Sequence, residues 1–278
     1  VDAGTQASVD LVSNCFISEC LSTMYKTALT LGNKEEAEEF AIRREKLNKL
    51  IHQTFYRADE GIYSTGSQLD MCYPMLVGVV PDSLYNKVKE NVVTMTEEKY
   101  KGHIAVGLVG VPILTEWAVR NKQVDFFYQM MKKRDYPGYL YMIDHGATAT
   151  WEYWSGERSR VHNCYNGIGT WFYQAVGGIR LDEAKPGYRH FYVDPQIPNG
   201  VTWAKVTKES PYGTIAVNWK LKDDNQLNLQ LTVPAGTTAT VCIPNNAVSC
   251  KKNKKKVSVK ERTVDVEAGH YDFLFNLK

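Results

Sequence analysis

Apolar side chains in the N-terminal part of the chain recur every three or four positions, the period of an amphipathic helix. The first such stripe ends at Gly32, a residue type that commonly terminates helices. A second stripe extends from Asn33, which can cap a helix with Glu36 three residues later, to about Phe55. We expect the first stripe to face the protein core, and its members are Val12, Phe16, Cys20, Met24, Ala28 and Leu31.

Five more predicted helices follow the same period. Pro81 closes the first of them, and Gly177 and Gly178 end the last. Short turns alternate with two longer loops, residues 56–67 and 133–162, so we expect the helices to pair as antiparallel hairpins. The predicted spans are Gln68–Val79, Ser83–Met95, Leu108–Val119, Val124–Lys132 and Asn163–Val176.

The pattern changes after Lys185, where prolines separate short runs in which apolar and polar residues alternate. Such runs predict strands, and the segments Ser210–Gly213, Asp223–Asn225 and Pro234–Thr237 have the composition of turns between them. The predicted strands include Thr214–Trp219, Leu227–Val233 and Tyr271–Leu277.

Together the two patterns predict an α + β protein with separate domains. Residues 1–182 form a helix-hairpin (α/α) toroid, and residues 183–278 form an antiparallel β-sandwich. A closed (α/α)6 barrel needs about twelve helices, more than are predicted here, and no sequence repeat of fixed period is found. The helices therefore form either an open stack or the C-terminal part of a larger barrel, and the absence of Met at position 1 favours the larger protein.

Composition narrows the class of partner. The formal net charge is +2, with 44% hydrophobic and 12% aromatic residues, which is typical of a folded globular chain and excludes disordered or collagen-like chains. This balance gives no reason to expect nucleic acid or a membrane as a partner, and the basic run Lys251–Lys256 is interpreted as a hairpin turn. The location is not encoded in these residues; for the full-length polypeptide we expect a periplasmic or secreted protein.

The six cysteines show no CxxC pair and no spacing typical of a metal site, so no metal and no cofactor are predicted. Reduced thiols buried in the core are the favoured interpretation, and a disulfide between Cys242 and Cys250 across a hairpin is the alternative. The cysteines are Cys15, Cys20, Cys72, Cys164, Cys242 and Cys250.

Candidate chemistry concentrates in Gly146–Trp154, GATATWEYW, where Glu152 lies between Trp151 and Trp154. Aromatic rings stack on the apolar faces of sugars while carboxylates bind the hydroxyls, so this pattern favours carbohydrate chemistry. A partly desolvated carboxyl group in such a site suits acid or base catalysis. The alternative is an amphipathic segment with its tryptophans in a core and its glutamate in water.

The loop around this segment, residues 133–162, is long and rich in aromatic residues. Loops of that kind in compact domains commonly carry function. The side chains that we expect to line a pocket there are Tyr139, Tyr141, Asp144 and His145, and His103 before a predicted helix is a further candidate.

Five blocks of sequence occur in a characteristic order, and Tyr136–Trp154 with its GATxxWExW element is the most specific. The other four are His103–Gly110, Ser159–His162, Gly169–Ile179 and Pro186–Phe191. Together they resemble the C-terminal half of bacterial α-L-rhamnosidases of glycoside hydrolase family 78. The similarity runs from about Ala3 into the predicted sandwich.

The resemblance implies an (α/α)6 barrel followed by a β-sandwich, and cleavage of the glycosidic bond with inversion. It implies that Glu152 is the general base that activates water and that His162 contacts the rhamnose hydroxyls. Trp151 and Trp154 would divide their roles, one shaping the sugar site and one packing in the core. A histidine at position 162 could equally cap the following helix or pack against Trp171.

An inverting glycosidase needs two carboxyl groups about 6.5 to 9.5 Å apart. In the family the general acid lies in an upstream acidic segment, and nothing in residues 1–100 resembles it. We therefore expect a fragment that is inactive by itself and whose partner is the upstream half of the same polypeptide. Val161 stands where the family commonly has Asn, and the interval from Glu152 to His162 is short, so the identity of the sugar stays open.

The predicted function is release of terminal α-L-rhamnose from a glycoside or polysaccharide by acid and base catalysis. The first alternative is a non-catalytic module that binds rhamnose or another carbohydrate, or serves as a scaffold. The second is another enzyme built on helix hairpins, such as a lyase or a different glycosidase, because fold by itself does not determine function.

Overall fold

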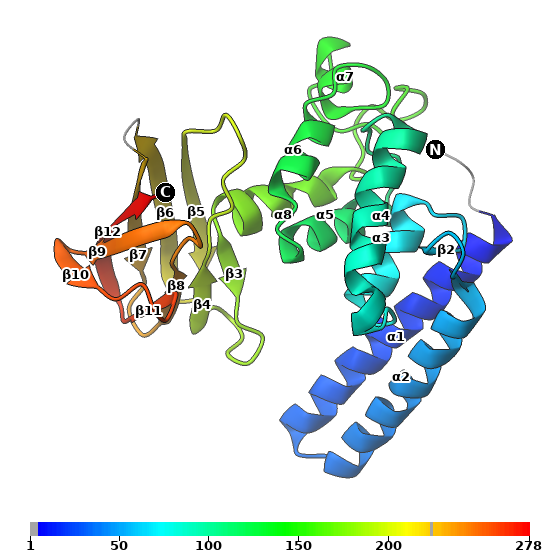
Figure 1. Cartoon of the computed structure of the whole chain (residues 1–278), viewed down its shortest axis with the longest axis horizontal. Helices are drawn as coiled ribbons and strands as arrows, with labels where there is room; N and C mark the ends of the chain where they lie inside the picture. The colour runs from blue at the N-terminus through cyan, green and yellow to red at the C-terminus, as the bar shows by residue number, and fades with distance from the viewer. Residues whose placement is uncertain (1–4, 223–224) are drawn as a thin grey trace. The chain divides into compact units, whose positions relative to one another are not determined.

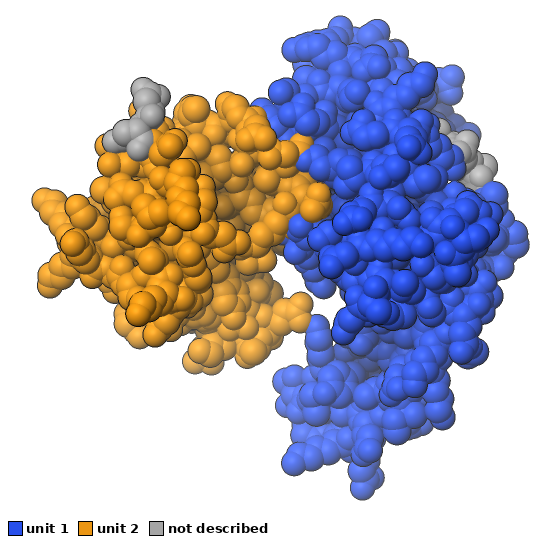
Figure 2. Space-filling model, in the orientation of Figure 1, with its two compact units in different colours: residues 1–121, 126–167 blue, residues 122–125, 168–278 orange. Residues whose placement is uncertain are grey.

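The computed structural model describes residues 5–222 and 225–278 (Figure 1). The chain divides into two compact units (Figure 2). The first comprises residues 1–121 and 126–167, and the second comprises residues 122–125 and 168–278. The predicted boundary between residues 182 and 183 falls inside the second unit. A helical part followed by β-sheets confirms the predicted fold class.

The first unit is built from helices, two of which form a long antiparallel hairpin drawn in blue in Figure 1. Gly32 adopts a left-handed φ of 81° between them, as expected for a helix C-cap. Asn33 makes no capping bond to the backbone, and its side chain donates to Glu36 instead. The helices are α1 Gln6–Leu31, α2 Lys34–Phe55, α3 Gln68–Leu76, α4 Asp82–Tyr100, α5 Gly110–Arg120, α6 Val124–Met131, whose first two residues belong to the second unit, and α7 Tyr139–Asp144.

The face that α1 buries differs from the predicted one. Phe16 is 59% exposed and Met24 is 47% exposed, whereas Leu11 and Cys15 on another side of the helix are fully buried. Helices α2 and α3 both pack against α1. The prediction that the stripe faces the core is therefore wrong for most of its members, and of them Ala28 is buried.

Helix α3 lies at the centre of the first unit, and seven of its nine residues are buried. Gln68 is 2% exposed and links three segments, because its amide donates to Thr96 Oγ1 and to the His103 carbonyl and accepts from the Ala105 N–H. At the other end of α3, the Trp117 indole N–H of α5 contacts Met75 Sδ at 3.1 Å. These contacts position the loop that begins at His103 against α3.

Two short elements lie in segments that the sequence predicted as loops. A two-stranded hairpin, β1 Tyr56–Arg57 and β2 Ile62–Tyr63, precedes α3, and α7 lies within the aromatic loop 133–162. The last predicted helix, Asn163–Val176, is not one continuous α-helix. It is divided into a 3-10 turn Asn166–Ile168, a single turn α8 Gly169–Trp171 and a π-helix Phe172–Val176, because the Gly177 N–H bonds to the Phe172 carbonyl five residues back.

The second unit contains a six-stranded sheet, β10-β9-β12-β7-β6-β5, and a four-stranded sheet, β11-β8-β4-β3. The three predicted strands lie within β6, β7 and β12, and every pair of neighbours is antiparallel except β4 and β8, which run parallel. The strands are β3 Ile179–Leu181, β4 His190–Val193, β5 Trp203–Ser210, β6 Gly213–Lys222, β7 Gln226–Val233, β8 Thr238–Cys242, β9 Ala247–Lys252, β10 Lys255–Val257, β11 Thr263–Val266 and β12 Gly269–Leu277.

The hairpin turns follow the sequence signals. Ser210 pairs with Gly213 at the turn between β5 and β6, and the basic run Lys251–Lys256 forms the β9–β10 hairpin. The predicted turn Asp223–Asn225 includes residues 223 and 224, which lie outside the described residues. Gly178 precedes β3 with φ 69°, and a Cβ atom there would lie 2.2 Å from the Pro195 nitrogen, so a side chain does not fit.

All six cysteines have free thiols. Cys15, Cys72, Cys164 and Cys250 are buried, and burial raises the pKa of the Cys72 thiol well above its ordinary value. Cys20 is exposed, contrary to the expectation of a core position, because it lies on the side of α1 that its neighbouring helices leave open. In the described part of the chain, no helix has both the length and the apolar character to span a bilayer.

Candidate functional site

The segment 150–162, here called the Glu152 loop, folds back on itself through main-chain hydrogen bonds. The His162 N–H donates to the Thr150 carbonyl at 2.8 Å, and the Thr150 hydroxyl donates to the His162 carbonyl at 2.5 Å. Farther along, the Glu152 N–H donates to the Ser159 carbonyl at 2.9 Å. Residues on the two sides of the loop are therefore held in register, with Glu152 opposite Ser159.

The Glu152 carboxylate is partly buried and is held from two directions. Its side chain is 27% exposed. Oε2 accepts from the Ser159 N–H at 3.3 Å, and Oε1 lies 3.6 Å from the Arg158 guanidinium. Arg158 has a left-handed φ of 56° and also packs over the Tyr153 ring, with 5.2 Å between its Cζ and the ring centroid. The carboxylate is thus oriented while one side stays open to solvent.

The two tryptophans beside Glu152 are both buried, with exposures of 3% for Trp151 and 1% for Trp154. Trp154 stacks on Tyr165 with ring centroids 3.9 Å apart and meets Tyr139 edge-on at 5.2 Å. Trp151 lies beneath the Arg160 guanidinium, which is 5.2 Å from the ring centroid. Both tryptophans are therefore buried packing groups of the Glu152 loop.

Two tyrosines that contact Trp154, and the thiol next to one of them in sequence, are also buried or half-buried. Tyr139 donates through its hydroxyl to the Tyr165 carbonyl at 2.8 Å, and burial raises the pKa of both phenols. Burial also raises the pKa of the Cys164 thiol, and the negative charge of Glu152 raises it further. All of these groups therefore stay neutral near pH 7, and the carboxylate faces no buried charge from them.

His162 is partly buried and closes the turn that precedes the 3-10 helix. Its Nδ1 accepts the Cys164 N–H at 3.0 Å, so the ring bonds to the main chain of the turn before the 3-10 helix Asn166–Ile168. An accepting Nδ1 requires the proton of a neutral ring to be on Nε2. Nε2 is therefore the atom with which this side chain can donate to a ligand.

Tyr141, Asp144 and His145 form a separate group on and just after α7. The Asp144 carboxylate is bound by Arg134 Nη1 at 2.6 and 2.8 Å. The His145 ring lies 4.0 Å from the Tyr141 ring, and its Nδ1 bonds to the Tyr141 carbonyl. The contacts found for these three residues are with one another, with Arg134 and with Tyr136, rather than with Glu152.

His103 has a structural partner on each ring nitrogen. Nδ1 lies 2.7 Å from the Pro137 carbonyl, and Nε2 lies 3.1 Å from Asp135 Oδ2. With 5% of its surface exposed, the ring fixes the loop 135–137 to the segment that begins α5. Among the described residues, no group of three or more histidine, cysteine or acidic side chains has the arrangement of a metal site.

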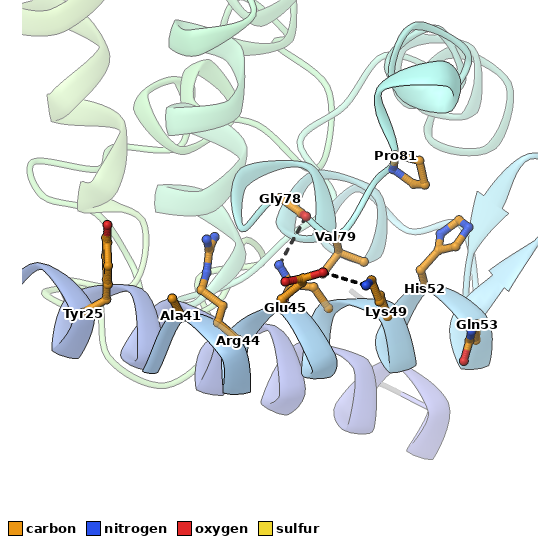
Figure 3. Close-up of a pocket in the computed structure, with 11 residues that line it drawn as sticks. Tyr25, Ala41, Arg44, Glu45, Lys49, His52, Gln53, Gly78, Val79 and Pro81 are labelled. Carbon is orange, nitrogen blue, oxygen red and sulfur yellow. Dashed lines mark hydrogen bonds and ion pairs between the residues drawn. The ribbon is translucent and has the colours of Figure 1, made fainter. Parts of the chain in front are cut away.

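A cavity of about 460 Å³ along α2 is shown in Figure 3. Asn48 donates from α2 to the Gly78 carbonyl at 3.2 Å, and Lys49 pairs with Glu45 at 2.6 Å. No residue predicted from the sequence for the sugar site lines this cavity.

The sequence did not indicate three of the contacts described above. Arg158 and Ser159 hold the Glu152 carboxylate, but the left-handed backbone that turns Arg158 toward it has no glycine or asparagine signal. Tyr165 stacks on Trp154, and its nearest signal was its place in the aromatic segment after His162.

Comparison with models of protein families identifies the family to which the chain belongs. Residues 1–176 match the model of the bacterial alpha-L-rhamnosidase 6 hairpin glycosidase domain, and residues 178–258 match the bacterial alpha-L-rhamnosidase C-terminal domain. The chain belongs to the bacterial α-L-rhamnosidase family. The family model of the helical domain therefore includes the whole Glu152 loop, and the family's C-terminal domain begins at the glycine pair that precedes β3.

Individual rhamnosidases are similar over nearly the whole chain. An alpha-L-rhamnosidase of Formosa agariphila is 28% identical over 292 residues, covering 96% of this chain and 31% of that protein. One of Alteromonas sp. (strain LOR) is 26% identical over 277 residues, covering 95% of this chain and 30% of that protein. The chain thus spans about 30% of the length of the curated relatives that it matches.

Solved rhamnosidase structures share the fold. The Streptomyces avermitilis alpha-L-rhamnosidase complexed with L-rhamnose superposes with a TM-score of 0.86 at 23% identity, over 95% of this chain and 26% of that one. The alpha-L-rhamnosidase from Dictyoglumus thermophilum gives a TM-score of 0.86 at 20% identity, over 94% of this chain and 31% of that one. The shared fold, helices and sheets included, therefore makes up about a third or less of each of those proteins.

Proposed function

We propose that the complete protein hydrolyses the glycosidic bond of terminal α-L-rhamnose in glycosides or polysaccharides, with inversion, and that Glu152 is the general base. Family membership supports the substrate class, and a relative of this family has been solved with L-rhamnose bound. The observation that carries the role of Glu152 is the way its carboxylate is held, partly buried and oriented by the Ser159 N–H and the Arg158 guanidinium. A base must be fixed within hydrogen-bond reach of the water that it deprotonates.

In this proposal the water lies on the open side of Glu152 and attacks the anomeric carbon while the leaving oxygen is protonated from the other face. The water gives one proton to the Glu152 carboxylate, and the departing sugar oxygen receives one from a general acid. His162 donates from Nε2 to a rhamnose hydroxyl, since its Nδ1 is already engaged by Cys164. No cofactor is needed for either step.

The general acid is proposed to lie outside these 278 residues. The carboxylates of the first unit that are bound by other groups are unsuited to the role. Asp70 is buried and accepts from Ser8 and Thr65, Asp135 binds His103, and Asp144 binds Arg134. The chain also covers only about 30% of its curated relatives, so the remaining length can supply both the acid and the partner helices for the exposed face of α1.

The test uses the polypeptide as its gene encodes it, with 4-nitrophenyl α-L-rhamnoside as substrate. We expect Glu152→Gln to lower kcat by about 1,000-fold or more while changing the Kd for rhamnose less than about threefold, since a base acts mainly in the transition state. NMR of the product formed by the wild type at early times should show the β-anomer first, as inversion requires.

Glu157→Gln is the matched control, because Glu157 is an exposed carboxylate in the same loop. Near-normal turnover of Glu152→Gln would remove Glu152 from the mechanism. A wild-type protein that binds rhamnose but cleaves no rhamnoside would instead establish the non-catalytic carbohydrate-binding module as its function.

A further inference from the structure

The six-stranded sheet of the second unit has a polar outer face. Side chains alternate between the two faces along a strand, and Val217, Leu229 and Phe273 on the inner face are at most 1% exposed. The residues between such inner positions therefore point outward. One outward row crosses strands β5, β6, β7 and β12 (Figure 1), and its members are Lys205, Asn218, Gln230 and Asp272.

A hollow of about 260 Å³ lies on this row. Asn218 and Gln230 line it from β6 and β7, and Asp272 lines it from β12. Sites for small ligands commonly measure about 300 to 1,000 Å³. A hollow slightly below that range suits one ring of a ligand, and the rest of a longer ligand would then lie along the sheet.

The side chains around the hollow bond to one another, with one exception. Gln230 Nε2 donates to Asp272 Oδ1 at 3.2 Å, and Thr232 Oγ1 lies 3.0 Å from His270 Nδ1. The carbonyl oxygen of the Asn218 side chain is buried and has no hydrogen-bond partner among the described residues. Leaving such a group unsatisfied is costly, and the last torsion of an asparagine side chain is soft. The Asn218 amide can therefore turn toward a ligand hydroxyl in the hollow.

An exposed tryptophan lies beside the row. Trp203 on β5 is 65% exposed, whereas each of the other five tryptophans is at most 3% exposed. Trp203 precedes Lys205 by two positions, and Lys205 pairs with Asn218, so Trp203 is a diagonal neighbour of Asn218 on the same face. Diagonal neighbours in a sheet lie about 7 to 8 Å apart. The indole is therefore within reach of a ligand that begins in the hollow.

These groups match a saccharide better than a protein surface. A sugar offers an apolar ring face to an indole and hydroxyl groups to amide side chains. The core of a protein interface is instead depleted of charged residues, whereas Trp203 pairs with Lys220 and has Lys205 two positions away. Both lysines lie outside the lining of the hollow, and Asp272 within it is acidic, so neutral sugars fit it better than acidic ones.

We propose that this outer face binds a neutral glycan chain, with one sugar in the hollow against Asn218 and Gln230 and a neighbouring sugar stacked on Trp203. This is a second carbohydrate site, in a different unit from Glu152, and it does not depend on the proposed function. It would retain the protein on a polysaccharide without taking part in bond cleavage.

Affinity electrophoresis of the gene-encoded polypeptide tests the proposal. The native gels contain galactan, xyloglucan or laminarin as neutral polysaccharides, or rhamnogalacturonan I as an acidic one. We expect at least one neutral polysaccharide to retard the wild type. Trp203→Ala and Asn218→Ala should each raise the Kd for that polysaccharide about fivefold, through loss of a stacking surface and of a hydrogen bond respectively.

Three controls keep the result interpretable. Trp203→Phe retains an aromatic ring and should bind more tightly than Trp203→Ala. Tyr212→Ala removes an aromatic residue that is 39% exposed in the turn between β5 and β6, and it should bind like the wild type. Turnover of 4-nitrophenyl α-L-rhamnoside should be the same in the wild type, Trp203→Ala and Asn218→Ala.

Retardation by none of the neutral polysaccharides, or equal retardation of the wild type and both alanine variants, would overturn the proposal. Binding only to rhamnogalacturonan I that is lost at high salt would also overturn it, because the charge of surface lysines would then explain the binding. A change in oligomeric mass in the alanine variants, measured by light scattering without a change in retardation, would make the face a protein interface instead. Failure of the proposed function looks different, since a protein that cleaves no rhamnoside would still be retarded in the same gels.

Discussion

The Arg158 guanidinium lies 3.6 Å from Glu152 Oε1, and Arg158 follows Glu152 by six positions in the chain. Their approach depends on the loop between them, in which Arg158 takes a left-handed φ of 56° and rests on the Tyr153 ring. A cation held in this way limits the rotation of the carboxylate. The relationship makes Arg158 a positioning residue for the proposed base.

Replacing Arg158 should therefore weaken turnover without abolishing it. We expect Arg158→Gln to lower kcat about threefold, because an ion pair this exposed contributes roughly 0.2–1 kcal/mol. KM should change little, and Arg158→Lys should recover part of the loss. Steady-state kinetics with 4-nitrophenyl α-L-rhamnoside provide the measurement.

Arg43→Gln is the control for that experiment, since Arg43 forms a comparably exposed pair with Glu39 on α2. Full activity in Arg158→Gln, or the same loss in both variants, would mean that the contact with Glu152 has no role in positioning.

His52 makes the stability of the first unit depend on pH. Its Nδ1 lies 2.7 Å from the Tyr63 hydroxyl, and its ring stacks on Tyr56 at 4.9 Å. Burial lowers the pKa of His52 and raises that of Tyr63, so the phenol donates to a neutral imidazole. A lowered histidine pKa gives stability that is present above the unfolded value of about 6.5 and is lost as the pH falls through the folded value.

Thermal melting of the chain between pH 8 and pH 5 tests this expectation. His52→Gln should be less stable than the wild type at pH 8 by about 1 kcal/mol, and the difference should shrink toward pH 5. His270→Gln, on β12 in the second unit, should leave the pH dependence of the first transition unchanged. A difference between His52→Gln and the wild type that stays constant over this range would contradict the linkage.

The exposed face of α1 predicts the behaviour of the isolated chain. Phe16, Ile17 and Met24 are 59%, 50% and 47% exposed on one helix, and contiguous apolar surface promotes association. We expect the 278-residue chain to bind a hydrophobic dye and to self-associate at micromolar concentration. The double variant Phe16→Asp, Met24→Asp should reduce both effects, as measured by light scattering and fluorescence.

Val248→Asp removes a similarly exposed side chain, 52%, from β9 and should change neither readout. A wild-type chain that is monodisperse and binds no dye would show that the α1 face needs no covering helices.

The sequence correctly predicted those elements that depend on the chemistry of neighbouring residues in the chain. Gly32 ends α1 in the left-handed conformation expected of it, and the alternating runs in β6, β7 and β12 form strands. The period of α1 identified a helix but not the face that it buries, because Phe16 and Leu11 both belong to apolar stripes and only the neighbouring helices choose between them.

The same distinction between local signals and tertiary packing applies to the candidate site. The sequence singled out Glu152 and the aromatic residues around it, since their types and order are unusual. It did not indicate that the His145 ring, one residue after α7, contacts the Tyr141 ring, because that contact depends on the short helix α7 in a segment predicted as a loop. The contact of Arg158 with Glu152 depends on a backbone conformation that no residue type in the loop signals.

The parallel pairing of β4 with β8 has a consequence for how the chain acquires its structure. His190 pairs with Thr238, 48 residues later, and β5, β6 and β7 form a meander in between. Closing so long a loop is entropically costly until the intervening hairpins have shortened it. During synthesis β3 and β4 therefore leave the ribosome well before β8, and the four-stranded sheet is completed only after β11 has emerged.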